Sequence, residues 1–491
     1  MSQALRDARA YEEEKELFIK PEDRPAFHLC ARVGWMNDPN GFSLYQGKYH
    51  MFYQYYPYDS HWGPMHWGHA VSADLLRWTF LPAALAPDTH YDHAGCFSGS
   101  ALELPDGRHL LMYTGVAKET TEDGELRDVQ TQNLAIGDGV NYRKYVGNPV
   151  LTAADLPEGG SRSDFRDPKM WRESDGSYRM IAANDAASGG GQMLLYRSDD
   201  GLSWSFLGVL AENNGRIGRM WECPDLFELD GKAVLLASSQ DMLPKGFEYH
   251  NGNGTCYLLG RVDPDTGRFI EESDHAVDYG IDFYAPQTVL TPDGRRVMIG
   301  WMQNWDTCNL HTKATRWFGQ MSLPRELSVK NGVLYQWPIR ELDALRRDEA
   351  VFEHVTAENG EVRLPGVRGR LLDLEVDIEG GDFNRFAIRF AQNELYRTGV
   401  SFRPHESVLK IDRKFSGSRR AIIHQRRALV NHEGGRLRLR LVLDRYSVEV
   451  FVNGGEKVMS ATLYTDLDAD GVSFYADGRV TFSVRKYALL I

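Results

Sequence analysis

Three acidic residues in the first half of the chain occupy the same position relative to a glycine. Asp38, Asp167 and Glu222 each lie nine residues before a glycine that opens an apolar run. Two carboxylates on either side of a glycosidic bond can hydrolyse it, one as the acid and the other as nucleophile or base. A third can hold ring hydroxyls and stabilise an oxocarbenium-like transition state. Three such acids could form a carbohydrate-cleaving site, provided that a repeated fold brings the three side chains together.

The same spacing recurs at Ser98 and Ala285, which gives five anchors. The glycines nine residues after the anchors are Gly47, Gly107, Gly176, Gly231 and Gly294. Four of these glycines follow an aspartate, and Asp-Gly between apolar runs is a strong signal for a tight hairpin turn. Strand–turn–strand units that repeat every 55 to 70 residues or so, about the size of one blade, are typical of a β-propeller. The pattern predicts five blades, with the anchors where the innermost strands meet the central channel.

An ordinary structural role for the three acids is the alternative. Aspartate near proline is common in turns, and Asp38 and Asp167 both precede a proline. Turn capping explains one such acid, but it explains three at one repeat position much less well. The chain also holds 11 Trp and 23 Tyr. Aromatic faces cover the C–H face of a sugar while carboxylates and amides bind its hydroxyls, so this combination favours a carbohydrate site.

Length, charge and cysteine content limit the classes of protein. A chain of 491 residues exceeds one ordinary core, so two domains are expected. The net charge of -13 argues against nucleic acid or an anionic membrane surface as a partner. No apolar run approaches the length of a membrane span. The 5 cysteines are scattered and odd in number, which is typical of reduced cytoplasmic thiols rather than of a disulfide framework.

The N-terminal segment could be mistaken for a signal peptide, and a group of histidines for a metal site. Residues from Met1 to about Lys20 lack the apolar core of a signal peptide, so we expect a short surface helix and a cytoplasmic location. His61, His66 and His69 do not have the spacing of a standard metal site. Structural hydrogen bonds around the Trp62 loop are the expected role of these histidines, and no metal or cofactor is predicted.

The pattern of the chain changes near residue 350. Residues 339–347 place apolar side chains at helical spacing and predict a short linker helix. Farther on, alternation of apolar and polar residues predicts strands with one buried face, as in a β-sandwich. These strands lie at Leu372–Ile378, Leu437–Leu443 and Ser447–Val452, with breaks at Glu379–Asp382 and Asn453–Gly455. The chain is thus divided into an N-terminal helical extension (1–26), a five-bladed propeller (27–337), a linker helix (338–350) and a β-sandwich domain (351–491).

Several stretches, taken in order, carry a resemblance to a known family. They are Trp35–Gly41, Phe97–Ser100, Phe165–Lys169, Trp221–Asp225, Phe283–Gln287 with Gly300-Trp301, Met321–Leu327 and Asp444–Phe451. They resemble the signatures of glycoside hydrolase family 32, which contains the invertases, sucrose-6-phosphate hydrolases and fructanases. Because they span nearly the whole chain in the family's order, the resemblance is specific, and it implies the same all-β propeller and sandwich.

The resemblance implies a role for each site residue. Asp38 would be the nucleophile that forms a covalent fructosyl-enzyme, and Glu222 the general acid and then the base. Asp167 would bind two fructose hydroxyls and stabilise the transition state, helped by Arg166. The remaining residues of the fructose subsite would be Asn37, Gln54, Trp62, Phe97, Ser98, Tyr284 and Trp301, with Cys223 as a neighbour of Glu222.

Some of these assignments have structural alternatives. Gln54 could be a core polar group, and Trp301 could serve blade packing. Cys223 is expected to pack rather than to participate in chemistry. A ring of three acids should raise the pKa of the least solvated one, and Glu222, beside Cys223 and Trp221, is the candidate.

The expected function is a retaining β-fructofuranosidase acting on sucrose, sucrose 6-phosphate or short fructo-oligosaccharides. Two alternatives stay open, an inverting arabinanase-like propeller enzyme and a non-catalytic sugar-binding propeller. The expected partner is a small carbohydrate, and the sequence leaves open whether the chains form a homo-oligomer. Recognition of a phosphate would need basic residues near the channel mouth, and Lys245, Lys313 and Arg316 are candidates.

Overall fold

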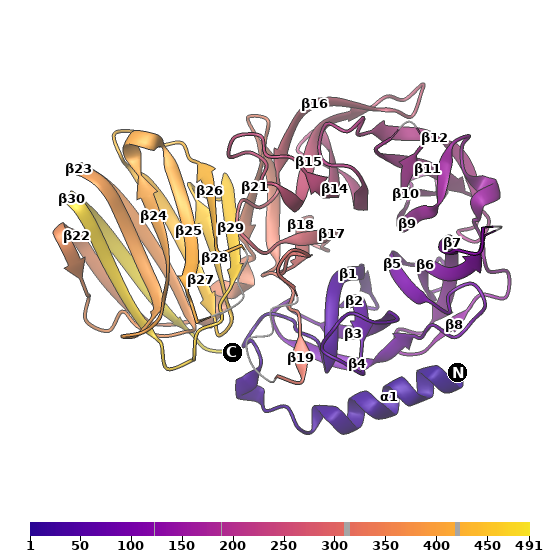
Figure 1. Ribbon diagram of the computed structural model, residues 1–491, viewed down its shortest axis with the longest axis horizontal. Helices are drawn as coiled ribbons and strands as arrows, with labels where there is room; N and C mark the ends of the chain where they lie inside the picture. Colours follow the sequence, from indigo (N-terminus) through magenta and orange to yellow (C-terminus); the bar gives the residue numbers. More distant parts are fainter. Residues whose placement is uncertain (122, 188, 309–314, 418–422) are drawn as a thin grey trace.

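The computed structural model describes residues 1–491 except residues 122, 188, 309–314 and 418–422. Figure 1 shows five small sheets arranged in a ring, with a layered β-domain packed against one side of the ring. The ring is the five-bladed propeller and the second domain is the β-sandwich. Both predictions from the sequence are confirmed.

Each blade is an antiparallel sheet in which successive strands run outward from the centre of the ring. Blade 1 contains β1 (Gly34–Tyr45), β2 (Lys48–Tyr56), β3 (His66–Ser72) and β4 (Trp78–Leu85). Blade 2 contains β5 (Gly95–Glu103), β6 (His109–Thr120), β7 (Leu126–Gly137) and β8 (Tyr142–Lys144). Blade 3 contains β9 (Gly160–Arg172), β10 (Tyr178–Ala186), β11 (Gly191–Ser198) and β12 (Ser205–Glu212). Blade 4 contains β13 (Trp221–Leu229), β14 (Lys232–Met242), β15 (Gly252–Val262) and β16 (Phe269–Ala276). Blade 5 contains β17 (Tyr284–Leu290), β18 (Arg296–Trp301), β20 (Arg325–Lys330) and β21 (Val333–Pro338).

The predicted glycine turn joins the first and second strands of every blade. Gly107 and Gly176, for example, have φ angles of 80° and 89°. Only glycine enters this left-handed region without steric cost, and a three-residue hairpin loop needs such a residue at its last position. The nine-residue spacing therefore measures the length of the innermost strand from the anchor to its turn.

The innermost strand of each blade bulges at its anchor, where its register against the second strand shifts. The shifts lie between Met36 and Pro39 in β1, Phe97 and Gly99 in β5, Arg166 and Lys169 in β9, Glu222 and Asp225 in β13, and Tyr284 and Gln287 in β17. A bulge interrupts the hydrogen-bonded ladder, so a proline can be accommodated there, and it turns a side chain away from the regular alternation. The recurrent prolines after the anchors thus have a structural reason, and the bulges aim the anchor side chains.

The ring closes through a short strand, β19 (Trp317–Phe318), which lies between β18 and β20 in the sequence. Instead of joining blade 5, it pairs in parallel with the start of β1, where Gly34 lies opposite Trp317 and Trp35 lies opposite Phe318. Residues from the end of the propeller therefore complete its first blade.

The N-terminal segment forms the expected surface helix, α1 (Gln3–Glu16), along the outer edge of blade 1 (Figure 1). Leu5, Ala8 and Glu12 are its buried residues. Glu12 accepts a hydrogen bond from the N–H of Ala83 at 2.9 Å and lies 3.0 Å from Nη1 of Arg32. Burial nevertheless raises the pKa of Glu12 to about 6. A short 3₁₀ turn, η1 (Pro21–Asp23), follows the helix, and another, η2 (Ala153–Asp155), precedes β9.

The sandwich domain is built around two long strands, β23 and β30, that pair with each other. Its strands are β22 (Arg346–Val362), β23 (Leu372–Gln392), β24 (Arg397–Arg403), β25 (Val408–Phe415), β26 (Gln425–Leu429), β27 (Leu437–Asp444), β28 (Ser447–Val452), β29 (Lys457–Thr462) and β30 (Gly471–Leu489), with the 3₁₀ turn η4 (Pro404–Glu406) before β25. The first part of β23 pairs with β27 and the second part with β24. The predicted alternating strands are present. The expected break at Glu379–Asp382 is wrong, because Gly380 and Gly381, at φ 120° and 143°, form a bulge inside the continuous strand β23.

The segment between the domains differs from the expected linker helix. Only Arg340–Leu345 is helical, as the 3₁₀ helix η3, and β22 already begins at Arg346. Leu342 and Leu345 are buried, which is the source of the helical spacing in the sequence. Across the described residues, no helix has both the length and the apolar character needed to cross a membrane.

Candidate active site

Hydrogen bonds between blades connect the anchors at the centre of the ring. Ser98 Oγ on β5 donates to Oδ2 of Asp38 on β1 at 2.7 Å. The N–H of Cys223 on β13 donates to Oδ2 of Asp167 on β9 at 2.9 Å. Since Glu222 directly precedes Cys223 in the bulge of β13, the three acids from blades 1, 3 and 4 belong to one site.

Asp38 has both carboxylate oxygens in hydrogen bonds. Besides the bond from Ser98 to Oδ2, Asn37 Nδ2 donates to Oδ1 at 3.1 Å. Trp35 in turn fixes the amide of Asn37 by donating its indole N–H to Oδ1 of Asn37 at 2.7 Å. Burial raises the pKa of Asp38; the hydrogen bond from Ser98 opposes this rise and the charge of Glu222 adds to it. A carboxylate held in one orientation within a dry site can act as a nucleophile.

Arg166 connects the acids of blades 3 and 4. Its Nε lies 3.1 Å from Oε1 of Glu222, and its Nη1 donates to Oδ1 of Asp164 at 2.9 Å. The hydroxyl of Tyr284 donates to the other oxygen of Glu222 at 2.7 Å, so this carboxylate is held at both ends. Burial raises the pKa of Asp167; the positive charge of Arg166 opposes the rise, while the two other acids add to it.

The expectation that Glu222 is the least solvated acid is wrong. Asp38 and Asp167 are 8% and 6% exposed, whereas Glu222 keeps an intermediate exposure. Burial raises the pKa of both aspartates, which lie deeper in the site. Glu222 lies nearer to solvent than either aspartate.

Cys223 contacts two of the acids, which the sequence did not indicate. Its Sγ lies 3.4 Å from Oδ2 of Asp38 and 3.6 Å from Oδ2 of Asp167. Burial and the charges of both aspartates raise the pKa of the thiol well above its usual value, so it stays protonated and can donate. Cys223 and Asp167 also have positive φ angles, 47° and 62°. Such backbone conformations are costly for residues other than glycine and occur where surrounding structure enforces them, often at functional sites.

The aromatic residues predicted for the site differ in their exposure. Trp62 is 48% exposed on the loop between β2 and β3, and its ring lies edge-on to Phe97 at a centroid distance of 6.2 Å. Trp301 is fully buried and packs against Trp35 and Trp305, with centroid distances of 6.0 and 4.9 Å. The Trp62 ring is therefore accessible to a ligand and Phe97 is partly so, whereas Trp301 belongs to a buried aromatic wall with Trp35.

Gln54 and two residues that bind the backbone of β9 beside Asp167 come from the second and third strands of their blades. Gln54 is buried and donates Nε2 to the carbonyl of Cys96 at 3.0 Å, which fits the structural alternative for this residue. Thr114 Oγ1 accepts the N–H of Asp167 at 2.9 Å, and Gln130 Oε1 accepts from the N–H of Phe165 at 2.9 Å. Sequence reasoning missed Thr114 and Gln130 because neither lies at a repeat anchor. It also overlooked Trp35, although this residue stands three positions before an anchor.

Two of the basic residues considered for phosphate recognition make cation–π contacts. Lys245 Nζ lies 6.0 Å from the ring centre of Tyr249, and the Arg316 guanidinium lies 5.1 Å from that of Phe18. Lys313 lies outside the described residues.

The three histidines near the Trp62 loop form local hydrogen bonds. Nδ1 of His61 lies 3.0 Å from Oδ1 of Asp59, and Nδ1 of His66 lies 3.0 Å from the carbonyl of Pro64. His69 is buried 2.9 Å from a second histidine of the same blade. These contacts match the structural role expected for them.

A propeller with three carboxylates gathered at its centre has the groups that a glycoside hydrolase needs, since such enzymes use a pair of carboxylates at the scissile bond. Residues 28–338 match the model of the glycosyl hydrolases family 32 N-terminal domain, and residues 341–488 match that of the family's C-terminal domain. The chain belongs to glycoside hydrolase family 32, and its enzyme class is that of the β-fructofuranosidases.

Relatives and solved structures agree with this assignment. The chain is 37% identical to a sucrose-6-phosphate hydrolase of Escherichia coli, over 92% of this chain and 91% of that protein. It is also 37% identical to a raffinose invertase of Escherichia coli, over 92% of both chains. A mutant of the GH32 beta-fructofuranosidase of Bombyx mori in complex with sucrose superimposes with a TM-score of 0.83 at 36% identity, covering 99% of this chain and 98% of that one.

Proposed function

We propose that this protein hydrolyses the terminal fructosyl bond of small β-fructosides with retention of configuration. The observation that carries the proposal is the convergence of Asp38, Asp167 and Glu222, with Cys223 in contact with both aspartates. The sucrose complex of the Bombyx mori relative supports sucrose as a member of the substrate class.

The proposed mechanism begins with attack of the Asp38 carboxylate on the anomeric carbon of fructose. Ser98 and Asn37 hold this carboxylate, so its reacting oxygen is aimed before the substrate arrives. Glu222 donates a proton to the departing glycosidic oxygen, and a covalent fructosyl-enzyme forms on Asp38. Glu222 then takes a proton from water, the water attacks the same carbon, and fructose leaves with its original configuration.

Asp167 binds rather than reacts in this scheme. It would accept hydrogen bonds from fructose hydroxyls, which become more acidic as positive charge develops at the anomeric carbon, so the contacts strengthen in the transition state. The Cys223 N–H and Thr114 Oγ1 anchor its side chain and backbone, respectively. Trp62 and Phe97 would cover an apolar face of the sugar.

The stereochemical outcome tests the mechanism. We expect that ¹H NMR of the first-formed product shows retained configuration, and that added methanol yields methyl fructoside by transfer from the covalent intermediate. Inverted product without transfer would support the arabinanase-like alternative. Sugar binding without release of reducing sugar would support the non-catalytic one.

The preferred leaving group needs a separate measurement, because two relatives of equal identity bear different names, sucrose-6-phosphate hydrolase and raffinose invertase. We propose that kcat/KM values measured in parallel for sucrose, sucrose 6-phosphate and kestose identify the substrate. A phosphate site predicts a preference for sucrose 6-phosphate of at least about tenfold, the equivalent of 1.4 kcal/mol. A cytoplasmic location stays a prediction and the oligomeric state stays open, and light scattering after size-exclusion chromatography measures the latter.

A further inference from the structure

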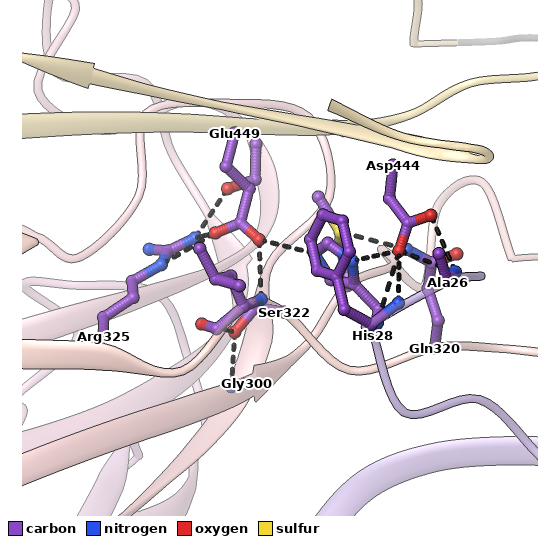
Figure 2. Close-up of polar contacts among 12 residues, drawn as sticks. Ala26, His28, Gly300, Gln320, Ser322, Arg325, Asp444 and Glu449 are labelled. Atoms are coloured by element: carbon purple, nitrogen blue, oxygen red, sulfur yellow. Dashed lines mark hydrogen bonds and ion pairs between the residues drawn. The ribbon is translucent and has the colours of Figure 1, made fainter. Parts of the chain in front are cut away.

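Two carboxylates of the sandwich domain reach into the propeller at the junction of the domains. Asp444 ends β27 and Glu449 lies in β28, and both side chains are fully buried. Figure 2 shows them beside His28 and Arg325 of the propeller. Burial of ionised groups is costly unless partners compensate them, so such a cluster calls for a reason.

Asp444 binds the chain that enters blade 1. Its carboxylate accepts hydrogen bonds from the successive N–H groups of Ala26, Phe27 and His28, at 2.8, 3.1 and 3.3 Å. Nδ1 of the His28 ring lies 2.8 Å from the same carboxylate. This sandwich residue thus fixes the position of residues 26–28 on the propeller.

Glu449 binds His28 and also a second segment of the propeller. Nε2 of His28 lies 3.0 Å from Oε1, and the same oxygen accepts the N–H of Leu323 at 2.6 Å. Arg325 donates Nε and Nη2 to Oε2 at 2.9 and 2.5 Å. Burial lowers the pKa of His28, but Asp444 and Glu449 outweigh it and raise the pKa to about 9, so the ring is an imidazolium at neutral pH that donates from both nitrogens.

The segment that Glu449 holds, residues 320–323, supports a wall of the active site. On one side, Met321 donates its N–H to the carbonyl of Leu29 at 2.7 Å. On the other, Ser322 donates its N–H to the carbonyl of Gly300 at 2.7 Å, and Gly300 returns its N–H to Ser322 Oγ at 3.0 Å. Trp301 follows Gly300 and forms a bridge with Met321. The place of Trp301 is therefore set by a segment that the sandwich domain fixes.

From Trp301 the contacts lead to the nucleophile. Trp301 packs on Trp35, whose indole N–H binds Asn37 Oδ1, and Asn37 Nδ2 binds Asp38. We propose that Glu449 is a positioning residue for fructosyl transfer, acting through residues 320–323 and Trp301 on the orientation of Asp38. The inference rests on the proposed function, and it gives the sandwich domain a part in the chemistry of the propeller.

Another buried ion pair of the sandwich provides a matched control. Asp373 is fully buried and accepts from Arg440 Nε and Nη2 at 3.0 and 2.8 Å. The contacts that the structure gives for its carboxylate lead to Arg440 and Arg346, away from residues 320–323. Asp373→Asn and Glu449→Gln therefore remove the same kind of buried charge from the same domain, but only the second touches the active-site support.

The first test compares the two variants with wild type on sucrose, at a temperature well below the measured Tm of each. We expect Glu449→Gln to lower kcat/KM about 10- to 100-fold, the scale of a misplacement of about 1 Å at a reacting group. Asp373→Asn should keep the wild-type kcat/KM even if its Tm falls as far as that of Glu449→Gln. Equal activity of the two variants would overturn the positioning role. Inactivity of the wild type on all fructosides would instead refute the proposed function.

A double-mutant cycle with Trp301→Phe separates positioning from general loosening. If Glu449 acts through Trp301, the two losses in kcat overlap, and the double variant is about as slow as the slower single variant. If Glu449 only stabilises the fold, the losses multiply, and the proposal fails. Asp373→Asn combined with Trp301→Phe is expected to give multiplied effects and serves as the reference.

A milder variant keeps the test valid if Glu449→Gln does not fold. Ser322→Ala removes one hydroxyl, which accepts the N–H of Gly300, and leaves the buried charges intact. We expect this variant to keep a Tm near that of the wild type and still lose several-fold in kcat on sucrose. An unchanged kcat for Ser322→Ala would show that the segment does not position Trp301.

Discussion

The hydroxyl of Ser98 offers a quantitative test of how the fold prepares Asp38. Of the donors to this carboxylate, Ser98 Oγ is the nearest, at 2.7 Å, ahead of Asn37 Nδ2 at 3.1 Å and Cys223 Sγ at 3.4 Å. Its hydrogen bond stabilises the ionised form and is the largest of the influences that lower the pKa of Asp38. Ser98→Ala removes this donor and leaves the backbone of β5 unchanged.

The expected size of the effect follows from the charge of the acceptor. A hydrogen bond to a charged group contributes roughly 1.5–3 kcal/mol. Since a change of one pKa unit corresponds to about 1.4 kcal/mol, the pKa of Asp38 should rise by about 1–2 units in Ser98→Ala. A nucleophile must be ionised to attack, so the acidic limb of the kcat/KM profile on sucrose should move to higher pH by that amount.

Ser100→Ala is the matched control for this experiment. Ser100 lies on the same strand, is equally buried, and donates to the carbonyl of Pro168 at 2.7 Å instead of to an acid. We expect the acidic limb of this variant to coincide with that of the wild type. The reasoning is refuted if Ser98→Ala leaves the acidic limb in place, or if both variants shift it equally.

Three further outcomes are expected. The kcat/KM of Glu222→Gln on sucrose should fall about 10²–10⁴-fold, the usual contribution of general acid–base catalysis, and the alkaline limb of its pH profile should disappear. With a substrate whose leaving group needs no proton, the rate of fructosyl transfer to the enzyme should fall far less. Equal losses on both substrates would assign the acid to another residue. Asp167→Asn should lower kcat more than it raises KM, because its contacts strengthen in the transition state; a change in KM alone would make it a simple clamp. His66 and His109 have pKa values lowered by burial to about 4 and about 3. The unfolded chain therefore takes up protons first as the pH falls below about 6.5, and the free energy of unfolding should decrease from there down to these folded-state values. Urea denaturation at pH 7 and pH 4.5 measures this decrease, which should be smaller in His109→Gln; an equal decrease in both proteins would contradict the assignment.

Repetition made the fold and the main acids predictable from the sequence. The turn glycines and the anchors recur at a fixed distance, so Asp38, Asp167 and Glu222 could be placed at equivalent points of one ring. Thr114 and Gln130 could not be found, because each binds the backbone of β9 from a neighbouring strand through a contact that leaves no local pattern.

Contacts that depend on packing were also misjudged. Cys223 resembles a packing residue until the bulge of β13 turns its thiol toward Asp38 and Asp167. The predicted order of burial was wrong for the same reason: Glu222 was expected to be the most buried acid, but Asp38 and Asp167 are more buried. Solvent access depends on the walls around a site rather than on neighbours in the sequence. A Gly-Gly pair suggested a break between two strands, but Gly380 and Gly381 bend one long strand that passes from one part of the sandwich to the other.

The closure of the ring by β19 constrains the way in which the chain can be made. Blade 1 is translated first, yet β1 acquires its parallel partner only from Trp317 and Phe318, and residues 26–28 acquire the acceptor for their N–H groups only from Asp444. While the ribosome is still extending the chain, the first blade therefore lacks a strand partner and a buried counter-charge for His28. Contacts this distant in sequence slow folding and leave partly formed sheets exposed to aggregation. The first blade to emerge is thus among the last to be completed, and a nascent chain that stalls before residue 444 carries an unfinished propeller.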